Sequence, residues 1–238
     1  MTDNKERVAD MRREVESVAT YSCAYSGAAG EVIAERKGHI AESWISDTKW
    51  SDRTHNRNYG DTPDFVRLTT MFERLARHGG FTRAVEIGCG DGKYLAYLRR
   101  NTETPIAEWI ATDLEGPRLA KAREEVTDIR IEAADILQCA ARYGEPGTLF
   151  LAANVMGNIA PDDIYAFFGA LNKPQLGLVL LAAGLSLEST KPFALRNNGI
   201  AFDHNYFDLL RGSTLICREY EVSFDTTVVG YWVAAMTP

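Results

Sequence analysis

The sequence predicts an α/β fold: a seven-stranded, mostly parallel sheet that closes on an antiparallel hairpin and is preceded by a helical segment. Three observations support this prediction. Short apolar segments alternate with helical segments from residue 83 onward, a glycine-rich turn follows the first of them, and two long strand-like segments lie together near the carboxyl end. Because parallel neighbours need a crossover connection, such alternation favours a parallel sheet.

Five strands are predicted in the alternating run, after a helix over 64–77 that ends at His-Gly-Gly. The predicted strands cover residues 83–88, 108–113, 128–135, 148–154 and 176–184. Helices are predicted between them at 93–100, 116–126 and 161–173. The hairpin is expected from 213–224 and 227–236, which only a short polar connection separates.

The amino-terminal segment differs from the rest of the chain. Residues 4–20 repeat apolar side chains at helical spacing, and residues 21–63 are polar and aromatic. We therefore divide the chain into a helical lid segment, 1–63, and an α/β domain, 64–238. Trp44, Trp50 and Tyr59 are expected to exclude water or to face an organic substrate. The alternative is that the tryptophans only anchor the amino-terminal helices.

Composition limits the function classes. The net charge is -7, from 26 basic and 33 acidic residues, and no basic patch is evident, which argues against a nucleic-acid partner. The four cysteines form no CxxC pair, so neither a zinc site nor a disulfide framework is expected. The first twenty residues are too charged for a secretory signal, and the apolar run 176–185 is too short to cross a membrane. We expect a soluble, cytoplasmic protein.

The turn after the first strand points to a nucleoside ligand. It reads Val-Glu-Ile-Gly-Cys-Gly-Asp-Gly, with glycines at 88, 90 and 92, where a ligand can approach bare backbone. A dinucleotide fingerprint would have glycine at the sixth place of GxGxxG, whereas Lys93 stands there.

The pattern Glu86, Gly88, Gly90, Gly92 resembles the first motif of the class I S-adenosylmethionine-dependent methyltransferases. The resemblance implies a Rossmann-like sheet with S-adenosylmethionine as cofactor. It also implies that Glu86 lies near the cationic aminoacyl end of that cofactor, while the glycine loop, Cys89 included, passes beside it.

The ends of the next strands carry suitable residues for the same ligand. Asp113 falls about 20 residues beyond the loop, where a carboxylate can accept from both ribose hydroxyls, and Leu114 would then lie against adenine. The resemblance places Asp135 at the adenine amino group and Ile136 on the ring. Asn154 ends the fourth strand, at the edge where open α/β sheets bind ligands.

Two histidines are candidates for the base that an oxygen acceptor would need. His204, after the fifth strand, is preferred, although a partly exposed loop histidine without a catalytic role is an equal alternative. His55, in the aromatic segment, is the second candidate. Met156 and Asn158, just past the fourth strand, are expected to line the acceptor pocket. No metal ligand set is predicted.

The acceptor class is narrowed by absences from the sequence. Neither the [DN]PP[YF] signature of enzymes that methylate adenine or glutamine amino groups nor a Pro-Cys nucleophile occurs. A small-molecule acceptor methylated on oxygen, nitrogen or carbon remains, and a homodimer is compatible with the sequence. The alternatives are a nicotinamide-dependent oxidoreductase, for which no Tyr-x-x-x-Lys pair is seen, and a non-catalytic methyltransferase-like binding protein.

Overall fold

The computed structural model describes residues 59–171, 173–182, 185–186, 193–196, 201–210, 213–222 and 227–236. The predicted amino-terminal helix therefore lies outside the described residues, as do Trp44, Trp50 and His55. No helix within the described ranges is long and apolar enough to cross a membrane.

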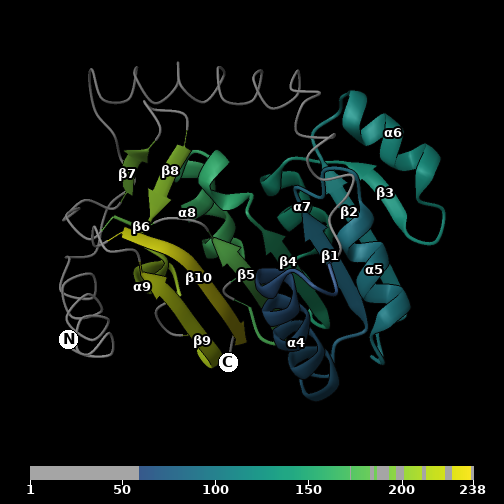
Figure 1. Cartoon of the computed structure of the whole chain (residues 1–238), viewed down its shortest axis with the longest axis horizontal. Coiled ribbons are helices and arrows are strands. Elements are labelled where there is room, and N and C mark those ends of the chain that lie inside the picture. The colour runs from purple at the N-terminus through teal and green to yellow at the C-terminus, as the bar shows by residue number, and fades with distance from the viewer. Residues whose placement is uncertain are drawn as a thin grey trace.

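Five parallel strands form the centre of the molecule, in the order β3-β2-β1-β4-β5 (Figure 1). They are β1 (Arg83–Ile87), β2 (Glu108–Asp113), β3 (Arg130–Ala133), β4 (Thr148–Ala153) and β5 (Leu176–Ala182). The parallel α/β sheet predicted from strand–helix alternation is thus confirmed. Since β1 is central and its neighbours lead to opposite sides, the carboxyl ends of β1, β2 and β4 meet at one edge.

Antiparallel strands continue the sheet beyond β5. β10 (Thr227–Met236) pairs with β5, and β9 (Thr214–Val222) pairs with β10. The two-residue strand β6 (Leu185–Ser186) also pairs with β10, so this sheet has eight strands among the described residues rather than the seven predicted. A separate pair, β7 (Phe193–Arg196) and β8 (Ala201–His204), is antiparallel. It was not expected, because its segments are too short to show a clear period.

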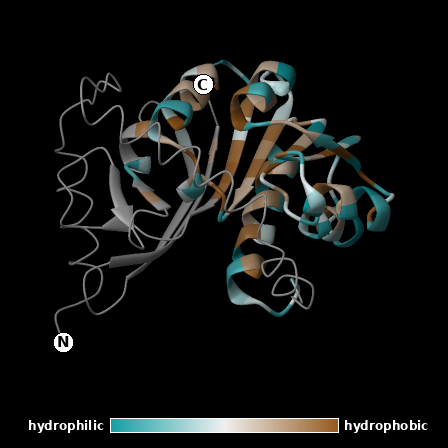
Figure 2. Cartoon of the chain, turned by 90° about the horizontal axis from the view of Figure 1, so that it is seen from above, coloured by the Kyte–Doolittle hydropathy of each residue, from teal (hydrophilic) through white to brown (hydrophobic). Residues whose placement is uncertain are grey.

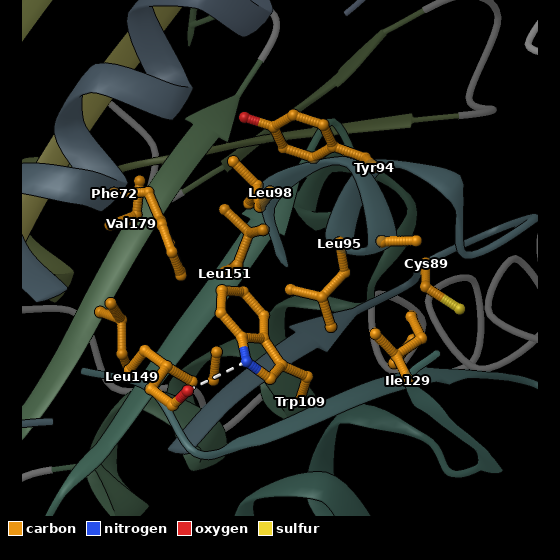
Figure 3. Packing of buried hydrophobic residues seen from close by; sticks show 14 of the residues in the cluster. Phe72, Cys89, Tyr94, Leu95, Leu98, Trp109, Ile129, Leu149, Leu151 and Val179 are labelled. Atoms are coloured by element: carbon orange, nitrogen blue, oxygen red, sulfur yellow. Dashed lines mark hydrogen bonds between the residues drawn. The ribbon is translucent and has the colours of Figure 1, made fainter. Parts of the chain in front are cut away.

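Helices cover both faces of the sheet, and Figure 2 shows the apolar strands lying between them. α4 (Pro63–His78), α5 (Lys93–Asn101) and α6 (Pro117–Glu125) contribute to one buried cluster. In that cluster the Trp109 indole is buried and its Nε1 donates to the Ile106 carbonyl over 3.1 Å (Figure 3). α7 (Ile136–Tyr143), α8 (Pro161–Ala170) and the short α9 (Tyr206–Leu209) contribute to the other cluster.

Helix α7 was missed in the sequence, although it carries a start signal. The Asp135 side chain accepts from the Gln138 amide, and the Gln138 side chain accepts from the Asp135 amide, which together form a capping box. Asp135 followed three residues later by Gln138 is the sequence form of this cap. The helix is only eight residues long, so its apolar side chains span too few turns to show a clear helical period.

Candidate cofactor site

The glycine loop joins β1 to α5 in a backbone shape that side chains resist. Gly88, Gly90 and Gly92 all have positive φ, of 66°, 59° and 70°. A Cβ on Gly88 would meet Val155 Cγ2 at 2.1 Å, so this glycine is required by packing as well as by φ. A Cβ on Gly90 would meet nothing within 4 Å, which leaves open space beside the loop at that residue.

The loop is fixed to the end of the neighbouring strand. The Cys89 amide donates to the Thr112 carbonyl over 2.9 Å, and the Gly90 amide donates to Asp113 Oδ2 over 2.7 Å. The Cys89 side chain is buried, and burial raises the pKa of its thiol. The loop and the end of β2 thus form one hydrogen-bonded unit, with the Cys89 side chain buried.

Asp113 is the centre of this unit. Its Oδ1 accepts from the Leu114 amide over 2.7 Å, and Arg118 Nη2 lies 3.8 Å from Oδ2. Burial raises the pKa of Asp113, while Arg118 and the amides of Gly90 and Leu114 act in the opposite direction. The structure therefore holds the carboxylate in a defined orientation at the end of β2.

Glu86 lies beneath the loop and is almost completely buried, at 3% exposed. Among the described residues, its Oε2 has no hydrogen-bond partner. Burial raises the pKa of Glu86 well above its usual value, and the carboxylates of Asp91 and Asp113 raise it further. A buried carboxylate oxygen without a donor is costly, and a cationic donor would relieve that cost.

Asp91 is a buried acid of the loop that was not among the residues predicted for the site. It is 6% exposed, and the Lys93 amide donates to its Oδ1 over 3.3 Å. Lys93 Nζ lies 3.6 Å from Asp91 Oδ2 and 3.1 Å from Glu125 in α6. An aspartate two residues before the helix-starting lysine is a turn-forming signal that could have revealed it.

The residues predicted to surround adenine follow β2 and β3, whose ends are paired through Asp113 and Ala133. Leu114 is 36% exposed, whereas Ile136 belongs to the hydrophobic core. The exposed apolar side chain of that turn is the neighbouring Leu137. Asp135 is exposed, and its Oδ1 caps α7. The adenine contacts of Leu114, Asp135 and Ile136 stay predictions.

The segment after β4 turns sharply at the carboxyl edge of the sheet. Asn154 is exposed and has a φ of 58°. Next come Val155, which covers Gly88, and the 3₁₀ turn η1 (Met156–Asn158). Met156 is fully buried in the core, while Asn158 is partly exposed. Their roles toward an acceptor stay predictions.

His204 and Tyr59 lie away from the glycine loop in the sequence, and the structure places both in packed surroundings. His204 is fully buried, with Nε2 at 3.0 Å from the Met156 carbonyl and 3.1 Å from the Ile159 carbonyl. The Tyr59 ring packs at 4.9 Å from Phe65 and 5.1 Å from Tyr94, measured between ring centroids. His204 is therefore not the exposed loop residue of the alternative interpretation.

The described residues contain no group of three or more His, Cys, Asp or Glu side chains arranged to hold a metal ion. What the edge offers instead is an open backbone loop, a carboxylate with an unpartnered oxygen and a second carboxylate oriented by amides.

No protein-family model matches the sequence, and the comparison with curated proteins finds no relative. Solved structures do resemble the chain. A Burkholderia thailandensis 1,6-didemethyltoxoflavin-N1-methyltransferase, with 1,6-didemethyltoxoflavin and S-adenosylhomocysteine bound, is 16% identical, with a TM-score of 0.54. The match covers 92% of this chain and 94% of that one.

Two further matches are of the same kind. The N-methyltransferase NodS of Bradyrhizobium japonicum, in complex with S-adenosyl-L-homocysteine, is 17% identical over 85% of this chain and 98% of that one, with a TM-score of 0.55. A geranyl diphosphate methyltransferase in complex with GPP and sinefungin is 11% identical over the same shares, with a TM-score of 0.59. At these identities the likeness concerns the fold. The chain thus has the fold of the S-adenosylmethionine-dependent methyltransferases.

Proposed function

We propose that this protein is an S-adenosylmethionine-dependent methyltransferase that acts on a small molecule. The observation that carries the proposal is the pair of acids at the carboxyl edge: Glu86, buried with an unpartnered oxygen, and Asp113, oriented by two backbone amides. The fold shared with methyltransferases that bind S-adenosylhomocysteine or sinefungin supports it.

The residues present fit this cofactor. The ammonium group of its aminoacyl end is a donor of the kind that Glu86 Oε2 lacks. Asp113 would accept from the ribose hydroxyls, and the open side of Gly90 would admit the cofactor beside the backbone. Asp135, Leu114 and Ile136 would hold adenine, and Asn154 would complete the edge.

The cofactor supplies a methyl group on a sulfonium, which is already an excellent leaving group. The protein then has to orient the acceptor, exclude water and remove a proton where the acceptor carries one. Trp44, Trp50 and Tyr59 would exclude water, and Asn158, which follows the buried Met156 in the same turn, would line the acceptor side. Of the two candidate bases we keep His55 ahead of His204, whose Nε2 faces two carbonyl oxygens.

The acceptor is proposed to be a metabolite or natural-product intermediate, methylated on oxygen, nitrogen or carbon. This fits the solved structures of methyltransferases that are named for 1,6-didemethyltoxoflavin and geranyl diphosphate.

We further propose a cytoplasmic location and no nucleic-acid partner. Residues 1–63 would form a lid over the domain 64–238, and β9 and β10 would form its terminal hairpin. A homodimer would be compatible with this arrangement.

Calorimetric titration of the full chain with S-adenosylhomocysteine and, separately, with NADH tests the proposal. We expect S-adenosylhomocysteine to bind and NADH not to bind. Asp113→Ala should weaken binding by about a hundredfold, because two charge-assisted contacts of about 1.5 kcal/mol each are lost. Asp128→Ala, an acid remote from the loop that pairs with Arg100, is the matched control and should leave the affinity unchanged.

Three outcomes would contradict the proposal. Binding of NADH without S-adenosylhomocysteine would favour the oxidoreductase alternative. Equal affinity in Asp113→Ala and Asp128→Ala would remove the ribose assignment. Tight binding without methyl transfer to any small-molecule acceptor would favour the non-catalytic alternative.

A further inference from the structure

His204 occupies the last position of β8 and joins two segments that are 45 to 48 residues apart. Its Nε2 lies 3.0 Å from the Met156 carbonyl oxygen and 3.1 Å from the Ile159 carbonyl oxygen. The imidazole is fully buried, with the Phe202 and Tyr206 rings each 5.9 Å away between centroids. The side chain is thus held on several sides.

The chemistry of these partners fixes the role of one nitrogen. A carbonyl oxygen can only accept, so Nε2 must carry a hydrogen in order to bond to either of them. This holds for the neutral ring and for the imidazolium alike. Nε2 is therefore a donor shared between two carbonyls, and it is not available to take a proton from an acceptor.

The segment that His204 holds also contacts the glycine loop. Val155 directly precedes Met156, and its Cγ2 would be 2.1 Å from a Cβ placed on Gly88, so the valine packs directly against this glycine. The turn itself is closed by bonds from the Asn158 amide to the Val155 carbonyl and from the Ile159 amide to the Met156 carbonyl. Movement of this turn would therefore move the side chain that covers Gly88.

We propose that His204 is a positioning residue that couples the β7–β8 segment to the cofactor loop through the turn 155–159. The donor at Nε2 fixes the turn, and Val155 transmits that position to Gly88. The ligand in this inference rests on the proposed function, whereas the link between His204 and the turn does not. The segment between β5 and β9 thus influences cofactor binding although it is distant in sequence from the loop.

Two variants separate this role from simple core packing. His204→Phe keeps an aromatic ring and removes the donor, while His204→Gln keeps an N–H donor near the position of Nε2. We expect amide exchange at Asn158 and Ile159 to be about tenfold faster in His204→Phe, as loss of roughly 1.4 kcal/mol of hydrogen bonding predicts. His204→Gln should restore most of the protection.

The affinity for S-adenosylhomocysteine, measured by calorimetry on the full chain, tests the coupling. It should fall about fivefold in His204→Phe and recover in His204→Gln. Unchanged exchange at Asn158 and Ile159, or equal losses in the two variants, would overturn the proposal. If the wild-type chain binds no S-adenosylhomocysteine, both the proposed function and the coupling to cofactor binding fail. The amide exchange rates at Asn158 and Ile159 still decide whether His204 holds the turn 155–159.

A spectroscopic readout on the unmodified chain covers the case in which His204→Phe does not fold. The chain has four histidines, so ¹⁵N-labelled histidine gives few signals, and comparison with His204→Gln assigns the one from His204. We expect its Nε2 to carry a proton throughout the pH range in which the protein is folded. An unprotonated Nε2 would overturn the proposal and would favour the role of His204 as a base.

Discussion

The acidic side chains at the two edges of the parallel sheet have opposite surroundings. At the amino edge, Glu108 begins β2 and lies between Arg83 and Arg130, and Arg130 also pairs with Glu132 of its own strand. At the carboxyl edge, Glu86 is buried with an unpartnered oxygen. The same sheet therefore has paired charges at one edge and a carboxyl group with an unpartnered oxygen at the other.

The pKa values of the acids at the two edges are shifted in opposite directions. The hydrogen bond from Arg83 lowers the pKa of Glu108, and the hydrogen bond from Arg100 lowers that of Asp128. Burial raises the pKa of both Glu86 and Asp113. The amino edge contributes stability to the fold, whereas the carboxyl edge keeps carboxylates in an environment that a cationic ligand would improve.

The largest expected effect concerns one glycine from each edge. Gly88 and Gly147 both have positive φ, so alanine at either position costs about 1–2 kcal/mol of strain. At Gly88 the new Cβ would also meet Val155 Cγ2 at 2.1 Å, which adds about 1–3 kcal/mol of overpacking. At Gly147 it would meet only Thr82 Oγ1 at 3.5 Å, an ordinary contact.

Chemical denaturation of Gly88→Ala and Gly147→Ala therefore sharpens the comparison. The free energy of unfolding should fall more for Gly88→Ala, and the difference between the variants measures the contact term alone. Equal losses would mean that Val155 moves aside without cost.

The isosteric substitutions Glu86→Gln and Glu108→Gln should change the free energy of unfolding in opposite directions. The folded pKa of Glu86 is raised, so the wild-type protein loses stability as pH rises from the unfolded pKa toward the folded one. Glu86→Gln removes that loss. Without ligand it should be more stable than wild type, by about 1.4 kcal/mol for each pH unit of that window, and should bind S-adenosylhomocysteine more weakly.

Glu108→Gln is the opposite case. The folded pKa of Glu108 is lowered, so its contribution is present above the unfolded pKa and disappears as pH falls through the folded pKa. Because the side chain is 36% exposed, the loss at pH 7 should be at most about 1 kcal/mol. Thermal unfolding of both variants at pH 5 and pH 8 tests the contrast. A change in stability of the same sign in Glu86→Gln and Glu108→Gln, relative to wild type, would contradict it.

The third prediction separates folding from binding at the end of β3. Asp135→Ala should lower the free energy of unfolding by about 1 kcal/mol, because it removes the cap of α7. Asp135→Ser keeps a capping oxygen but removes the carboxylate. Serine should thus recover stability without recovering the affinity for S-adenosylhomocysteine, and recovery of both would remove Asp135 from the adenine site.

The smallest effect is expected at the end of α5, where Arg100 Nε and Nη2 donate to the two oxygens of Asp128 over 2.7 Å. Arg100 is exposed and Asp128 is partly exposed, so Asp128→Asn should cost less than about 1 kcal/mol and should leave ligand affinity unchanged. The loss should shrink in 1 M salt. A large loss of affinity would show that the two edges are not independent.

The fold could be predicted from the sequence where the backbone conformation at a position requires a particular type of residue. The five parallel strands were predictable because buried β-forming segments alternate with helices, and the segment predicted for β2, 108–113, matches the structure at both ends. Gly88 and Gly90 were predictable because few residues other than glycine tolerate positive φ. Asp113 was singled out because an acid ends the second strand about 20 residues beyond the loop, and its ribose contact stays a prediction.

Other features depended on contacts that a sequence does not display. The burial of Met156 and of Ile136 follows from how α7, α8 and β8 pack, and not from their own neighbours in the chain. The hydrogen bonds of His204 link residues 45 to 48 positions apart, so no local pattern could predict them. Asp91 was missed because a loop aspartate is usually solvated, whereas here it lies beneath Lys93.

The bond from the Gly90 amide to Asp113 Oδ2 has a consequence for the kinetics of ligand capture. The acid proposed to grip the sugar already anchors the turn before any nucleoside arrives, so the entropy of ordering the turn is lost during folding and not on association. Capture should then proceed as a single bimolecular step whose rate rises linearly with ligand concentration, without a slow rearrangement of the backbone.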